Sequence, residues 1–144
     1  MEAPSATTMR SEVTHSALLR PITYNNGLLY PKGKSTLQAE IEHRRRAHQT
    51  VPFTEEEVLN TVIPVIECLQ HVHGQGIAHG SVTPKHILVT EEEEIKLMDW
   101  LSQDKQDSFY YPHSHPCTAN DDWAALGQIL AQIATLRQPS KPFE

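Results

Sequence analysis

The clearest helical signal lies in the middle of the chain. Thr54 is followed three residues later by Glu57, which makes a capping box at the start of a helix. Apolar residues then recur at helical spacing through residues 58–72 and form one face. Pro64 removes one backbone hydrogen bond within this run and is expected to kink the helix. The pattern predicts a long amphipathic helix that ends at about Gly74.

Further helices are predicted before and after this one. Ser35 or Thr36 can cap a short helix that runs to about Arg46. Another helix is predicted from about Asp121 to Leu136, and ten of the 14 residues 123–136 are apolar. A helix that is apolar around its circumference is normally buried on most sides. We therefore expect other elements to cover this last helix.

Shorter apolar runs predict strands. Leu28–Tyr30 follows a strong turn signal, and Ile77–His79 is a run of strand length. Ile87–Val89 and Ile95–Met98 flank a polar turn and are typical of a β-hairpin. The acidic residues 91–94 are expected to form its solvated tip. Together with the helices, these runs predict an α+β fold that is mainly helical.

Length and composition describe one domain with a modest core. The chain has 144 residues, of which 38% are apolar and 21% are charged. Residues 1–20 are rich in serine, threonine and proline and lack apolar periodicity, so we expect a disordered leader there. The predicted domain therefore spans residues 21–144.

Charge, hydropathy and cysteine content limit the possible partners of the chain and its cellular compartment. The net charge of −6 argues against nucleic-acid binding, which needs a basic face. No apolar run approaches the roughly 18 residues that a membrane span requires, so no membrane partner is expected. Cys68 and Cys117 do not make a disulfide framework, which indicates a reducing compartment. We expect a cytoplasmic location, with the nucleus as the open alternative.

One continuous segment carries a recognisable motif. Residues 79–89, HGSVTPKHILV, resemble the catalytic loop of protein kinases, whose pattern is H-R-D-L, then K-P-E-N and an apolar strand. Residues 69–76 resemble the end of the helix that precedes this loop in kinases. Residues 99–101 resemble the D-F-G motif, and residues 122–130 resemble the buried helix of the C-lobe. With a weaker match to the hinge at residues 28–37, the resemblance implies a partial protein-kinase C-lobe.

The departures from the kinase pattern fall on catalytic positions. Ser81 stands where the family has the aspartate that orients the substrate hydroxyl and accepts its proton. Gly80 replaces the preceding arginine, and Thr83 replaces the lysine of serine/threonine kinases. His86 replaces the asparagine that holds a magnesium ion, and imidazole is a poor ligand for that metal. The resemblance thus implies a degenerate catalytic loop without catalytic residues.

Several family positions keep their residue type or chemistry. His79 is expected to brace the loop, and Asp122 is expected to bond backbone amides of the loop. Lys85 is a candidate contact for a nucleotide phosphate, since tyrosine kinases carry an arginine there. Asp99 is a candidate ligand for one Mg²⁺ ion or a vestige of that site, and Trp100 is expected to fill an apolar stack.

These observations imply a pseudokinase that acts as a binding or scaffold module. The sequence ahead of residue 28 contains no glycine-rich phosphate loop and no V-A-I-K lysine, so no ATP or Mg²⁺ cofactor is expected. Phosphoryl transfer depends on all of these parts acting together. One alternative is a regulatory module with residual ATP and Mg²⁺ binding. Another is a truncated kinase-like product with little independent function.

The expected partner surface is the apolar helix. If Trp123–Leu136 is not fully covered within the chain, its exposed apolar surface implies a protein partner or self-association. A separate alternative is metal binding, because His113, His115 and Cys117 lie within five residues and His79 and His86 could lie nearby. Structural zinc requires four nitrogen or sulfur ligands, commonly at longer separations.

Overall fold

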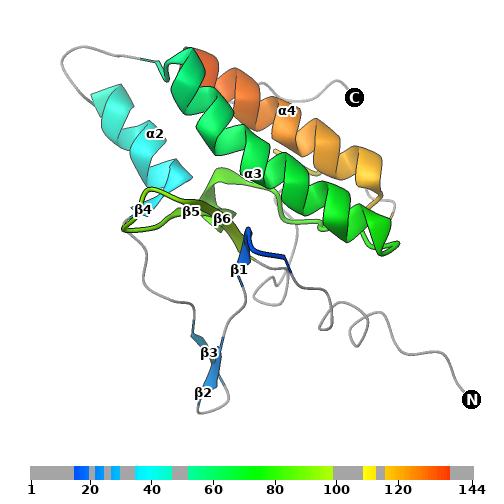
Figure 1. Cartoon of the computed structure of the whole chain (residues 1–144). Coiled ribbons are helices and arrows are strands. Elements are labelled where there is room, and N and C mark those ends of the chain that lie inside the picture. Colours follow the sequence, from blue (N-terminus) through cyan, green and yellow to red (C-terminus); the bar gives the residue numbers. More distant parts are fainter. Residues whose placement is uncertain are drawn as a thin grey trace, which may run out of the picture.

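A pair of long helices and a small sheet form the frame of the molecule (Figure 1). The computed structural model describes residues 15–19, 22–24, 27–29, 35–46, 52–98, 109–112 and 116–136. Helix α3 (Glu55–Gly74) packs against helix α4 (Ala119–Thr135) and against the sheet. The short helix α2 (Leu37–Arg46) contacts the sheet and the 3₁₀ turn η1 (Pro84–His86). The expected α+β class is therefore confirmed.

The main sheet has four strands in the order β1-β6-β5-β4. Its centre is the predicted hairpin, formed by β5 (Ile87–Val89) and β6 (Ile95–Met98). Strand β4 (Ser35–Thr36) pairs antiparallel with β5, and β1 (Leu18–Leu19) pairs parallel with β6. A separate antiparallel pair joins β2 (Ile22–Tyr24) to β3 (Gly27–Leu29). The prediction missed β2 and placed β3 one residue late.

Side-chain caps fix the starts of the first two helices. At α3, the Thr54 hydroxyl accepts the backbone N–H of Glu57 at 3.1 Å, and the Glu57 carboxylate accepts that of Thr54 at 2.9 Å. At α2, the Thr36 hydroxyl accepts the backbone N–H of Ala39 at 3.1 Å. Helix α3 continues through Pro64 and ends just before Gly76, which has a φ of +78°. The predicted boundaries of both helices are confirmed.

Helix α4 starts two residues before the predicted position. Thr118 is its N-cap and forms a second capping box with Asp121, whose carboxylate accepts the Thr118 backbone N–H at 2.8 Å. The T-x-x-D spacing is therefore the start signal, and Asp121 lies within the first turn. At the other end, the backbone N–H of Leu136 bonds the Gln132 carbonyl at 2.6 Å, with Leu136 at a φ of 57°.

The expected leader is wrong at its C-terminal end. Ala17 and Leu18 are buried, and the backbone N–H of Leu97 donates to the Ala17 carbonyl at 2.6 Å. These few apolar residues form the edge of the sheet beside β6, which lies far along the chain. A run this short carries no periodicity, which is why the sequence pattern did not mark it. Residues 1–14 and 20 lie outside the described residues.

The predicted strand at residues 77–79 is also wrong. Ile77 and His79 are buried in an irregular segment that pairs with no strand among the described residues. Backbone N–H groups of this segment instead bond a carboxylate on α4. The apolar run therefore reflects burial rather than a place in the sheet.

Helix α4 buries one face and exposes another. Leu126, Ile129 and Ile133 lie in the core together with Ala125, whereas Ala124 and Ala131 are exposed. Trp123 and Leu130 are partly buried. The expectation that this helix is covered on most sides is thus correct for part of its circumference only. In the described part of the chain, no helix combines the length and apolarity needed to cross a membrane.

Candidate functional site

The segment between α3 and η1 is held in place by one carboxylate. Asp122, on the first turns of α4, is 0% exposed. Its oxygens accept the backbone N–H of His79 at 2.6 Å and that of Gly80 at 2.8 Å. The φ of Gly80 is +81°, a conformation that glycine adopts without strain. The loop backbone is therefore curved around the start of α4.

Two more side chains complete the surroundings of Asp122. The Tyr111 hydroxyl donates to Asp122 Oδ1 at 2.7 Å and accepts the backbone N–H of Val82 at 2.8 Å. His73 Nε2 lies 2.7 Å from Asp122 Oδ2, and the His73 ring packs edge-on against Trp123 at 5.2 Å. Burial and the Asp122 charge raise the pKa of Tyr111, so its hydroxyl stays protonated. These contacts tie α3, the loop and residue 111 to α4.

The His79 ring has one defined tautomer. Its Nδ1 lies 3.0 Å from the backbone N–H of Ser81 and accepts that hydrogen. The remaining proton therefore belongs on Nε2, which lies 2.9 Å from the carbonyl oxygen of Met98 at the end of β6. Because both nitrogens are used for backbone contacts, the ring links the loop to the sheet.

Part of the chain is similar in sequence to curated protein kinases. No protein-family model matches the chain. It is 44% identical over 83 residues to a probable serine/threonine-protein kinase PknB of Corynebacterium glutamicum, covering 58% of this chain and 11% of that protein. It is 34% identical over 92 residues to serine/threonine-protein kinase 16 of Mus musculus, covering 64% and 29%.

A third relative matches a larger share of this chain. Ribosomal protein S6 kinase alpha-2 of Mus musculus is 38% identical over 116 residues, covering 69% of this chain and 15% of the relative. Part of the chain is related to serine/threonine protein kinases. It spans between 11% and 29% of the length of these three kinases. Their catalytic activity is therefore a property of much longer chains.

Ser81, which the sequence resemblance aligns with the kinase catalytic aspartate, lies inside the loop that Asp122 holds and is only 3% exposed. Two residues on, the Thr83 hydroxyl lies 2.7 Å from Nδ1 of His86, which the sequence resemblance aligns with the magnesium-binding asparagine of kinases. Lys85 is exposed on η1. The structure thus brings Ser81 and His79 together and leaves Lys85 facing solvent.

The metal predictions stay predictions. Asp99, Trp100, His113 and His115 lie outside the described residues. Within the described ranges, no three or more His, Cys, Asp or Glu side chains are grouped so that they could hold a metal ion. Cys117 is half-buried, and its sulfur lies 3.9 Å from Asp122 Oδ1.

Sequence reasoning did not single out Tyr111 or His73. His73 lies within residues 69–76, which resemble the end of the kinase helix ahead of the catalytic loop, so a signal for it exists in the resemblance to kinases. Tyr111 lies in a polar part of the sequence without apolar periodicity and carries no local signal, because its partners are Val82 and Asp122. Only the fold brings Tyr111, Val82 and Asp122 together.

Proposed function

We propose that this kinase-related chain is a non-catalytic module that binds other proteins. The observation that carries the proposal is the burial of Ser81, a serine that the sequence resemblance aligns with the kinase catalytic aspartate. A neutral hydroxyl is a poor base near neutral pH, and a positioned base contributes about 10²–10⁴ in rate. The proposal therefore follows from the residue type and from its burial together.

Burial adds to the effect of the lost carboxylate. A general base must lie about 2.6–3.2 Å from the proton that it removes. Ser81 is 3% exposed, and the residues beside it, Gly80 and Val82, are fixed by Asp122 and Tyr111. A substrate hydroxyl could approach Ser81 only if this loop opened. This supports a role for the loop in maintaining the fold rather than in phosphoryl transfer.

The partner surface that we propose for this module is the solvent face of α4. Exposed positions on this helix carry alanine, glycine and other uncharged residues, whereas the solvent face of a helix usually carries charges. The exposed residues are Asn120, Ala124, Gly127, Ala131, Ala134 and Thr135. A protein partner or a second copy of the chain could cover such a face with little desolvation of charge.

Phosphotransfer from radiolabelled ATP to a generic protein substrate tests the catalytic part of the proposal. We expect no transfer above background for the wild type. Transfer by the wild type that Asp99→Ala abolishes, and that the matched carboxylate change Asp121→Ala leaves intact, would contradict the proposal. A thermal-shift titration with ATP and Mg²⁺ addresses residual nucleotide binding, for which Lys85→Ala is the informative variant.

A further inference from the structure

A pair of imidazole rings joins the segment that contains β1 to α3. The rings of His15 and His71 have their centroids 5.3 Å apart and their planes tilted by 40°. His15 lies three residues before β1, and His71 is exposed near the end of α3. The ring contact is therefore a bridge between two parts of the chain that are far apart in the sequence.

The His15 ring also holds the backbone of its own segment. Its Nδ1 lies 3.0 Å from the backbone nitrogen of Ala17 and accepts the hydrogen of that N–H. A neutral imidazole has one N–H and one acceptor nitrogen, so the ring proton of His15 belongs on Nε2. A second proton on the ring would occupy Nδ1 and leave the Ala17 N–H without this acceptor. The hydrogen bond therefore exists only while His15 is neutral.

The same segment forms the edge of the main sheet. The backbone N–H of Leu97 donates to the Ala17 carbonyl at 2.6 Å, and Nζ of Lys96 donates to the Ser16 carbonyl at 2.6 Å. Leu18 is buried and pairs with Leu97. Strand β1 has only two residues, and a strand this short depends on each contact that fixes it. Loss of one contact can therefore shift the balance between its docked and detached states.

We propose that residues 15–19, which we call the latch, respond to pH through His15. The latch is docked on β6 while the His15 ring is neutral, and a proton taken up from water at Nδ1 shifts it toward a detached state. Detachment removes the acceptor of the Leu97 N–H and opens the β6 edge to pairing with another strand. Histidine ordinarily titrates between about pH 5 and 8, so the response is expected in that range. The inference is independent of the proposed function.

The charged groups around the latch determine the direction of the response. They are His71 and Glu67 on α3, Lys96 on β6, and Glu93 and Glu94 in the turn that joins β5 to β6. Carboxylate and ammonium groups ordinarily keep their charge between about pH 7.5 and 5.5, whereas imidazoles change theirs. Protonation of both rings would place two positive charges on neighbouring groups. The carboxylates attract these charges, but they cannot replace the acceptor that the Ala17 N–H loses, so acid weakens docking.

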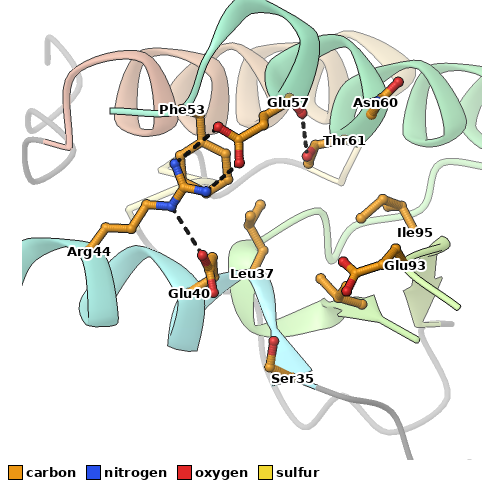
Figure 2. A pocket seen from close by; sticks show the side chains of 11 residues that line it. Ser35, Leu37, Glu40, Arg44, Phe53, Glu57, Asn60, Thr61, Glu93 and Ile95 are labelled. Carbon is orange, nitrogen blue, oxygen red and sulfur yellow. Dashed lines mark hydrogen bonds and ion pairs between the residues drawn. The ribbon is translucent and has the colours of Figure 1, made fainter. Parts of the chain in front are cut away.

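Two other contacts involve titratable groups and have to be separated from the latch. His73 lies 2.7 Å from Asp122, which also accepts the Gly80 N–H, so exchange at Gly80 reports on that pair. The ion pair of Arg44 with Glu57 (Figure 2) keeps its charges between about pH 7.5 and 5.5, because Arg44 lowers the pKa of Glu57 to about 2. A measurement at the latch and at Gly80 therefore distinguishes a local response from a change in the core.

Hydrogen exchange of the full chain, measured by NMR at about pH 7.5 and 5.5, tests the proposal. Protection is expressed relative to the intrinsic exchange rate at each pH. The Leu97 N–H should lose about tenfold in protection at the lower pH, whereas the Gly80 N–H should lose less than about threefold. The chemical shift of the Ala17 amide proton should titrate over the same range, because this N–H loses its imidazole acceptor.

His15→Asn is the informative variant. Asparagine can accept the N–H two residues on and does not titrate, so protection of Leu97 should no longer depend on pH. His43→Gln is the matched control, because it removes an exposed histidine on α2 and should leave the full response. Thermal melting at neutral pH verifies that each variant folds.

Three outcomes would overturn the proposal. One is equal protection of Leu97 at both pH values in the wild type. Another is a parallel loss at Leu97 and Gly80, which indicates general loosening of the core. The third is a response of His15→Asn as large as that of the wild type, which assigns the titrating group elsewhere. If His15→Asn does not fold, the wild-type comparison of Leu97 with Gly80 still decides. No measurement uses ATP or a partner, so the proposed function is tested separately.

Discussion

The carboxylate of Asp122 accepts the backbone N–H of His79 at 2.6 Å, across a sequence separation of 43 residues. Since Gly80 donates to the same side chain, Asp122→Asn places an amide NH₂ against at least one buried N–H donor. We expect a loss of about 1–3 kcal/mol in the free energy of unfolding, measured by urea denaturation. Asp121→Asn, a neighbouring change at a more exposed residue, is the control. Equal stability of the two variants would contradict the anchoring role.

The Tyr111 hydroxyl bridges Asp122 and the backbone N–H of Val82. Tyr111→Phe keeps the ring but leaves that N–H without its acceptor, which should cost about 1–3 kcal/mol. Hydrogen exchange at Val82 is the specific measurement, and it should accelerate in the variant. Tyr110→Phe, which removes a buried hydroxyl bonded to Gln132, is the comparison. Faster exchange at Val82 in both variants would indicate general loosening instead.

Local signals predicted the helices and the hairpin well. The capping box of Thr54 and Glu57 and the cap at Thr36 both lie within a few residues, so the sequence alone displays them. Strand β1 was missed because Leu18 pairs with Leu97, far along the chain. The apolar run that begins at Ile77 was wrongly predicted to be a strand. An apolar pattern indicates burial, but it does not indicate which groups the backbone bonds.

The candidate site was predictable only where the kinase resemblance supplied positions. His79, Ser81 and Asp122 were named from the motif, and the structure places them in one buried cluster. The bridge made by Tyr111 depends on how a distant segment folds back, which no spacing rule encodes.

The Arg44–Glu57 contact predicts a specific response to acid. The hydrogen bond from Arg44 lowers the pKa of Glu57 to about 2 from 4.5, with help from the Thr54 backbone N–H. The unfolded chain therefore binds the proton first as pH falls, so the stabilisation is present above about pH 4.5 and is lost toward pH 2. Because the Glu57 side chain is 40% exposed, we expect no more than about 1 kcal/mol.

Glu57→Gln tests this response, since glutamine still serves at the third position of a capping box. The variant should be slightly less stable than the wild type at pH 7, and the difference should shrink as pH falls from 4.5 toward 2. Denaturation midpoints across that range measure it. Glu56→Gln, in the same turn and exposed, should leave the wild-type acid profile unchanged. A constant difference at all pH values would show that the ion pair is not the cause.

The two cysteines should react at very different rates. Burial raises the pKa of Cys68 to about 12, so only about 0.01% of this thiol is ionised at pH 8. Cys117 is only half-buried and should take up iodoacetamide first. Peptide mass spectrometry of a native time course measures both sites, with labelling in denaturant as the reference. Labelling of native Cys68 as fast as Cys117 would contradict the burial of α3 in the core.

The uncharged face of α4 predicts association of the isolated chain. Ala131 lies on this face and is exposed, so Ala131→Glu adds a charge that a partner copy would have to desolvate. Sedimentation velocity over a range of concentrations should show self-association of the wild type that this variant weakens. His43→Glu adds the same charge at an exposed position on α2 and should leave association unchanged. A monomer at every concentration would instead mean that this face does not drive pairing.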